Sequence, residues 1–230
     1  MCMKYFFLIF IYLAASFLSL SLQAQDYTFT DERDGRVYRY VTIGDQTWMA
    51  ENLAYLPQIN RVEDAQFETE RFWVYGYRGT DVKEARQTEA YRIYGVLYNW
   101  TGACNSCPKG WHLPTDEEWR KLEMTLGMTS SEAKERLWRR SGEAGKKLMS
   151  KDGWKKQYGT NESGFNALPA GIRGLNGFEA AGYGAYFWTA SPTNGDNGLR
   201  RGLLFDDAGI NRTEERRYIG HSVRCVKDKK

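Results

Sequence analysis

Cysteine and histidine are the residues whose types and spacing could do chemistry in this chain. Cys104 and Cys107 form a Cys-x-x-Cys pair, and His112 follows close behind. That pattern is typical of a thiol–disulfide centre or of half a zinc site. Zinc needs about four ligands, yet His221 is the only other histidine and no second Cys-x-x-Cys exists. A redox motif should open a helix after a strand, whereas Pro-Lys-Gly at 108–110 indicates a turn. We therefore predict a structural disulfide.

The pairing of that disulfide follows from the few cysteines available. Cys2 lies before the N-terminal apolar run, so three cysteines remain once that run is removed. In an oxidising compartment two of them should pair. We favour Cys107–Cys225, because closing a long loop removes most entropy from the unfolded chain. Cys104–Cys107 is the alternative, and either choice leaves one thiol unpaired.

Other catalytic and metal-binding patterns are weak. No Gly-x-Ser-x-Gly elbow occurs, and His112 stands in a tryptophan–proline corner that suits a structural hydrogen bond. The acids at 116–118 are explained by helix capping. Asp196 and the Asp206-Asp207 pair could offer oxygen to calcium, but adjacent acids in loops are mostly solvated. We predict no catalytic residue, no metal site and no cofactor.

The N-terminus predicts export. Residues 5–22 are apolar apart from three serines, and Leu22-Gln23-Ala24 offers a small residue at the end, so residues 1–24 are predicted to be a signal peptide. A retained membrane anchor is the alternative. Residues 25–230 then form one domain that is periplasmic, on the outer surface or secreted, with no stable membrane span. Without Lys4 the 32 basic residues become 31, against 29 acidic, a balance that does not favour nucleic acid as partner.

Short strands are predicted at both ends of the domain, with helices between them. Turn signals and β-rich runs indicate hairpins over 26–54, and a charged excursion follows over about 57–90, with a short strand near 72–75. The segment 94–100 fits either a strand or a short helix. From residue 164 glycine alternates with aromatic residues, which predicts short strands near 164–171, 182–191, 203–205 and 221–226.

The clearest helix begins at Thr115. Thr115 and Glu118 form a capping box, and Trp119, Leu122 and Leu126 give the helix one apolar face before Gly127 ends it. A second helix is predicted over 130–140, with Ala133, Leu137 and Trp138 buried, and a further turn or two over 144–149. The fold class is therefore α+β, loop-rich, with short antiparallel strands and two or three helices.

Six ordered blocks resemble a known family. They are 34–53, 94–100, Cys-Pro-Lys-Gly-Trp-His-Leu-Pro-Thr and its continuation at 107–119, Gly-Phe-Asn-Ala-Leu-Pro-Ala-Gly at 164–171, Phe-Trp-Thr-Ala-Ser at 187–191, and Ser-Val-Arg-Cys-Val at 222–226. The chain is similar to the Fibrobacter succinogenes major paralogous domain of exported bacterial proteins, notably of Bacteroidetes. The resemblance implies a C-type-lectin-like fold, shared with formylglycine-generating enzymes. The excursion at 57–90 matches none of its blocks.

The function predicted is an exported, non-catalytic binding module of the cell envelope or surface, with a glycan or a surface protein as ligand. Aromatic faces stack on sugar rings, and amides and carboxylates pair with hydroxyls. The candidate ligand-binding residues are Tyr183, Tyr186, Asn194, Asp196, Asn197 and Asp206. The string at 194–197 also fits a plain turn, and five tryptophans are expected in the core: Trp48, Trp100, Trp111, Trp119 and Trp188.

Two alternatives remain for the function. The first is a protein-adhesion or structural component of a surface assembly. The second, less favoured, is an enzyme of the formylglycine-generating type. Its copper site would need a cysteine pair in the C-terminal part of the domain, where only Cys225 stands.

Overall fold

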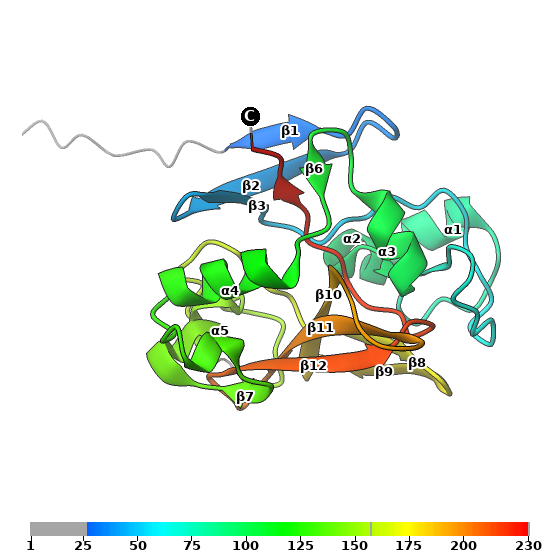
Figure 1. The fold of residues 1–230 in the computed structure, drawn as a ribbon. Helices are drawn as coiled ribbons and strands as arrows, with labels where there is room; N and C mark the ends of the chain where they lie inside the picture. The colour runs from blue at the N-terminus through cyan, green and yellow to red at the C-terminus, as the bar shows by residue number, and fades with distance from the viewer. Residues whose placement is uncertain (1–26, 157, 230) are drawn as a thin grey trace, which may run out of the picture.

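The computed structural model describes residues 27–156 and 158–229. The predicted signal peptide, residues 1–24, lies outside the described residues. The fold is α+β, as predicted: short helices accompany antiparallel strands that form two larger sheets and two small two-stranded sheets (Figure 1). Among the described residues no helix is both long enough and apolar enough to cross a bilayer.

The elements follow one another in many short pieces. The strands are β1 (Thr28–Thr30), β2 (Val37–Ile43), β3 (Gln46–Met49), β4 (Phe72–Trp73), β5 (Leu97–Tyr98), β6 (Trp111–His112), β7 (Leu137–Arg139), β8 (Ala170–Gly174), β9 (Gly177–Ala181), β10 (Gly184–Pro192), β11 (Asn197–Leu204), β12 (Ile210–Arg216) and β13 (Val226–Lys227). The helices are α1 (Val82–Gln87), α2 (Glu89–Tyr94), α3 (Trp100–Ser106), α4 (Asp116–Thr125) and α5 (Ala144–Leu148), with 3₁₀ turns η1 (Glu132–Lys134) and η2 (Ser141–Glu143).

The first sheet joins the two ends of the chain. Its strand order is β1-β2-β3-β13-β6, so the N-terminal hairpin pairs with the last strand. Val226 stands opposite Trp48 on one side and His112 on the other. The disulfide Cys107–Cys225 lies beside this junction, which confirms the predicted pairing. The disulfide thus cross-links the C-terminal segment to the middle of the chain beside the strand that joins both in one sheet.

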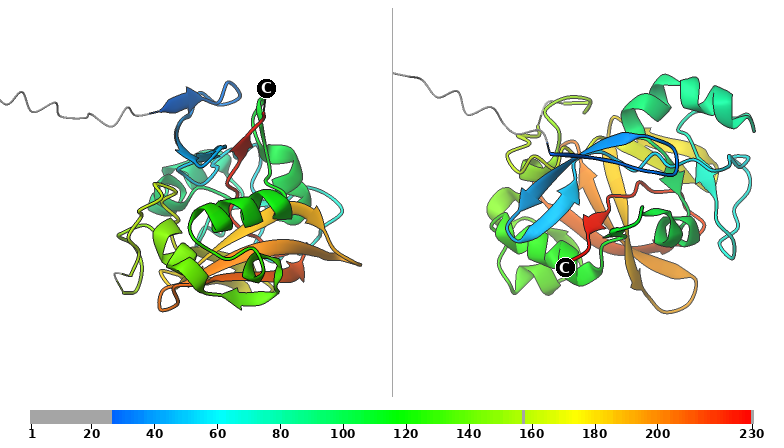
Figure 2. Two further views of the ribbon diagram at one scale, coloured as in Figure 1. Left: turned by 60° about the vertical axis from the view of Figure 1, so that its left-hand side comes forward. Right: turned by 90° about the horizontal axis from the view of Figure 1, so that it is seen from above.

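The second sheet carries helix α4. Its order is β10-β11-β12-β7, all antiparallel, and α4 lies over it (Figure 2). The predicted capping box is present, because Thr115 accepts from the Glu118 N–H and Glu118 accepts from the Thr115 N–H. Trp119 and Leu122 are fully buried below α4. A capped apolar face is enough to specify a helix locally.

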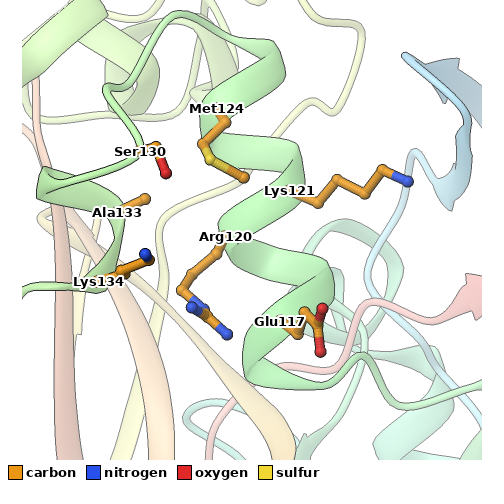
Figure 3. A pocket seen from close by; sticks show the side chains of 7 residues that line it. All are labelled: Glu117, Arg120, Lys121, Met124, Ser130, Ala133 and Lys134. Carbon is orange, nitrogen blue, oxygen red and sulfur yellow. The ribbon is translucent and has the colours of Figure 1, made fainter.

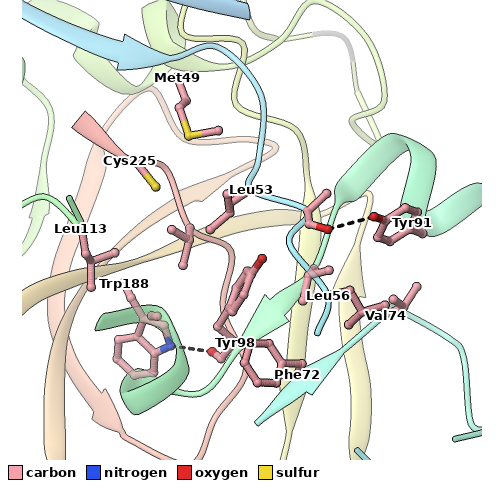
Figure 4. Packing of buried hydrophobic residues seen from close by; sticks show 14 of the residues in the cluster. Met49, Leu53, Leu56, Phe72, Val74, Tyr91, Tyr98, Leu113, Trp188 and Cys225 are labelled. Carbon is pink, nitrogen blue, oxygen red and sulfur yellow. Dashed lines mark hydrogen bonds between the residues drawn. The ribbon is translucent and has the colours of Figure 1, made fainter. Parts of the chain in front are cut away.

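Two buried clusters stabilise the fold. One lies under the first sheet and α1–α3, where Trp188 donates from Nε1 to the Tyr98 carbonyl at 2.8 Å (Figure 4). The other lies between α4, α5 and the second sheet around Trp119 and Phe165. Four of the five tryptophans expected in the core are buried; Trp100 is partly exposed.

The helix predicted over 130–140 is wrong. Only η1 is helical there, and β7 follows as an edge strand, with Leu137 opposite Arg212. Ala133 is buried as expected, but Leu137 is 62% exposed and has a positive φ of 65°. Strand pairing and the burial of Arg139 against Glu123 outweigh a local helical pattern, as tertiary contacts commonly do.

The charged excursion is more ordered than expected. It contains β4 and α1, and Phe72, Trp73 and Val74 are fully buried, so its charges cover a packed segment. The segment 94–100 is divided between the end of α2, strand β5 and the start of α3. The predicted strand over 221–226 is mostly irregular. His221 and Ser222 form single bridges to Tyr98 and Phe187, and only Val226–Lys227 is a strand.

Candidate functional site

The predicted ligand-binding residues do not form one site. Asn194, Asp196 and Asn197 lie at the turn between β10 and β11, whereas Tyr183 and Asp206 lie at the opposite end of the same strands. The ladder between these ends runs from the Gly184–Leu204 pair to the Pro192–Gly198 pair, which at ~3.3 Å per residue is roughly 25 Å. One sugar ring cannot contact both ends.

The turn at 194–197 is held through its backbone carbonyls. The Arg217 N–H donates to the Asp196 carbonyl at 2.9 Å, and Arg217 Nε donates to the Asn197 carbonyl at 3.0 Å. Thr193 Oγ1 donates to the Asn197 carbonyl as well. The side chains of Asn194 and Asp196 are exposed and line none of the hollows described below.

Tyr186 is part of the packing rather than of a free surface. Its ring stacks on the His221 ring with centroids 5.8 Å apart, and the guanidinium of Arg200, on β11, lies 5.0 Å from the centroid of the Tyr186 ring. Burial raises the pKa of Tyr186. His221 is fully buried, and burial together with the Arg200 charge lowers its pKa well below 6.5. His221 is therefore neutral and shielded from any dissolved substrate.

The structure contains a hollow that the sequence did not predict. This hollow, of about 420 Å³, is lined by Ile93, Ser150, Lys151, Asp152, Gly153, Asn161, Asn166 and Leu168, and we call it the amide groove. Tyr183 lies outside this lining, but Gly182 before it is bonded to neighbours of the groove: its N–H donates to the carbonyl of Pro169, which follows Leu168, at 2.9 Å, and its carbonyl accepts from the Lys155 N–H at 2.6 Å. The Tyr183 ring is 44% exposed and packs edge-on against Phe205.

Two asparagines give the amide groove its polar character. Asn161 and Asn166 have φ of 49° and 56°, a left-handed conformation that asparagine tolerates better than most residues. Asn161 Oδ1 accepts from the Asn166 N–H at 2.8 Å. Among the described residues Asn161 Nδ2 and the whole Asn166 side-chain amide make no other hydrogen bond, so they are free for a ligand. Neither asparagine was predicted as a site residue; their positions on either side of Gly164-Phe165 are the sequence signal that could have identified this loop.

A second, smaller hollow lies next to the amide groove. It has a volume of about 180 Å³ and shares Ile93, Asn166 and Leu168 with the groove. Its remaining lining is Arg36, Arg39, Glu51, Asn52 and Arg92, and we call it the arginine pocket. These residues come from β2 and the residue before it, from the segment after β3 and from α2, which only the folded chain brings together.

His112 has the partners of an acid–base residue but a structural position. Its Nε2 lies 2.9 Å from Glu118 Oε1 and its Nδ1 2.6 Å from Asp228 Oδ1. Burial lowers the pKa of His112, but the hydrogen bonds to Asp228 and Glu118 outweigh burial and raise it. The imidazolium thus ties the C-terminal segment to the α4 capping box.

The described residues hold no group of three His, Cys, Asp or Glu side chains suited to a metal ion. A further hollow, of about 250 Å³, lies between α4 and η1 (Figure 3). Its walls are Met124, Ala133 and the stems of charged side chains, and Lys121 beside it pairs with Asp45. It offers fewer polar groups than the amide groove.

The fold and the two hollows together define the class of protein: an α+β domain cross-linked by one disulfide, with an open polar hollow formed by loops. A family model described as the Fibrobacter succinogenes major domain matches residues 41–227. The chain therefore belongs to that family, as the sequence resemblance predicted. Comparison with curated proteins finds no match, and comparison with solved structures finds none.

Proposed function

We propose that this protein is an exported, non-catalytic binding module of the cell envelope or surface, and that it recognises glycans through the amide groove and Tyr183. One observation carries the proposal: the uncommitted amides of Asn161 and Asn166 line an open hollow. The exposed Tyr183 follows Gly182, which donates to the Pro169 carbonyl next to the lining residue Leu168. Amides pair with sugar hydroxyls, and an aromatic face stacks on the apolar side of a sugar ring. A few placed polar groups in a concave site are typical of small-ligand recognition.

The proposal includes the compartment and the finer fold. The apolar segment ending at Ala24 supports export, with cleavage before residue 25, and a disulfide suits an oxidising compartment. A loop-rich α+β domain whose first and last strands belong to one sheet is compatible with a C-type-lectin-like fold. Cys225 is bonded to Cys107, so it is not free to join a copper-binding cysteine pair.

A glycan array probed with the secreted domain, with and without a chelator, tests the proposal. Tyr183→Ala and Asn166→Gly should each lower the affinity for a bound glycan about tenfold, the effect of losing ~1.4 kcal/mol. Glycine at 166 removes the amide yet adopts the positive φ. Tyr27→Ala is the matched control, because Tyr27 is a similarly exposed tyrosine that precedes β1 and lines neither hollow.

Two results would contradict the proposal. An array without any specific glycan would shift the assignment to protein adhesion, with the hollow beside α4 as the next surface to test. Equal losses for Tyr27→Ala and Tyr183→Ala would show that the amide groove is not the binding site.

A further inference from the structure

The arginine pocket holds more positive charge than its own acid can balance. Arg39 Nε pairs with Glu51 Oε1 at 2.9 Å, and this uses the one carboxylate that lines the pocket. Arg36 and Arg92 form no ion pair within the described residues. The Arg36 guanidinium instead lies 5.4 Å from the ring centroids of Tyr38 and Tyr91. Two guanidinium groups are therefore free to face a ligand.

A third unbalanced cation lies beneath the pocket. Arg224 is fully buried, and its donors are directed to neutral oxygens: Asn52 Oδ1 at 2.8 Å, the Met49 carbonyl at 3.1 Å, the Asn166 carbonyl at 2.7 Å and the Phe165 carbonyl. No carboxylate lies within ion-pair distance of it. Burial lowers the pKa of Arg224 to about 9, and the more distant charge of Glu51 opposes that shift.

Arg224 remains protonated at neutral pH, and a buried charge without a counter-ion is costly. The residues that hold it, Asn52 and Asn166, also line the arginine pocket. An anion in the pocket would therefore be separated from Arg224 by the side-chain amide of Asn52. Water screens the attraction between the two charges less there than at an open surface.

We propose that the arginine pocket binds the acidic group of the ligand, a carboxylate or a sulfate ester, and that the ligand is an acidic polysaccharide. This inference rests on the proposed function, because the same chain of sugars would extend into the amide groove. The two hollows share Ile93, Asn166 and Leu168 in their lining, so they are immediate neighbours. Guanidinium groups match the planar oxygens of carboxylates and sulfates. Ile93, 44% exposed, adds an apolar wall for sugar C–H groups.

Matched pairs of probes test this inference on the secreted domain. Oligogalacturonate is compared with its methyl ester, and dextran sulfate with dextran, by calorimetry at low and high salt. For at least one pair the acidic form should bind ten times more tightly or better, and salt should reduce the difference. Arg36→Gln and Arg92→Gln should each remove about tenfold of that preference and leave the affinity for the neutral form unchanged.

Arg78→Gln is the control, since Arg78 is 68% exposed in its side chain and lies away from both hollows. Arg224 itself is not substituted, because its loss would leave buried carbonyls without donors and impair folding. Thermal unfolding of each variant verifies that the fold is intact.

The other outcomes are distinct. Equal binding of acidic and neutral forms, with no effect of Arg36→Gln or Arg92→Gln, overturns the acidic-ligand inference and leaves glycan recognition standing. Arginine-dependent binding of polyglutamate, with no oligosaccharide bound in either form, overturns both and identifies an acidic protein segment as the ligand. Failure of every probe to bind also overturns both.

Discussion

Glu123 should be the most sensitive charged position in the protein. It lies in α4 with no exposed side-chain surface, and Arg139 and Arg201 are equally buried. Arg139 donates to both carboxylate oxygens, through Nη1 to Oε2 and through Nη2 to Oε1 at 2.9 Å. Arg201 Nε donates to Oε1 at 2.6 Å. One carboxylate thus holds α4 to strands β7 and β11.

The substitution Glu123→Gln keeps the shape and removes the charge. It leaves Arg139 with a neutral partner and Arg201 with Asp116 as its one remaining carboxylate. The new amide N–H groups also face cations instead of accepting from them. Removing one member of a buried ion pair costs about 3–5 kcal/mol. A domain of this size has a total stability of about 5–15 kcal/mol, so Glu123→Gln should lose a large part of it.

Urea unfolding measured by circular dichroism provides the assay, with the midpoint and slope fitted separately. Glu117→Gln is the matched control, because Glu117 is an exposed, unpaired acid in the same helix; its effect should stay within about 0.5 kcal/mol. A loss below about 1 kcal/mol for Glu123→Gln, or one equal to the control, would refute the view that this ion network holds α4 in place.

Three further predictions concern titration and reactivity. Burial raises the pKa of Asp116, but its hydrogen bonds to Arg212 and the charges of Arg201 and Arg212 outweigh burial and lower the pKa well below 3.8. The stabilisation by ionised Asp116 is therefore present above pH 3.8 and is lost as the pH falls further. Asp116→Asn should make the free energy of unfolding in urea less dependent on pH between pH 5 and pH 2, and an unchanged dependence would contradict this prediction. The pKa of His112, measured by NMR, should lie above 6.5, and Asp228→Asn should lower it. The stabilisation by protonated His112 is complete below pH 6.5 and is lost as the pH rises through the folded-state pKa. A pKa at or below 6.5 in the unsubstituted protein would contradict this prediction. Burial raises the pKa of the Cys104 thiol to about 11, so thiol reagents at pH 8 should label it slowly in the native domain and rapidly after unfolding; fast native labelling would refute its burial.

Local chemistry made some elements predictable and left others open. Helix α4 was predictable because Thr115, Glu118 and an apolar face at helical spacing act within one segment. The disulfide was predictable because few cysteines were available. The prediction for segment 130–140 was wrong because its backbone is decided by pairing with Ile210–Arg212 and by the ion pair of Arg139 with Glu123. Both partners lie outside the segment, so its own periodicity could not reveal them.

The candidate site shows the same division. Tyr183 was singled out from the sequence as a loop aromatic, and the structure leaves it exposed. Asp196 and Asp206, grouped with it from composition, lie at opposite ends of strands β10 and β11. Arg36 and Arg92 were not singled out, because arginine in a charged sequence resembles an ordinary solvated surface residue. They are distinguished only by meeting in a pocket whose one carboxylate, Glu51, is paired with Arg39.

The amino-acid sequence by itself determined the α+β class, the family and the capped helix, and reduced the disulfide to two pairings of which Cys107–Cys225 was favoured, because each depends on short-range patterns or on a small choice of partners. The tertiary structure alone decided the order of strands, the burial of Arg224 without a counter-ion and the placing of the arginine pocket next to the amide groove. These features arise where segments far apart in the chain meet, and their energies come from burial and charge that no single segment contains.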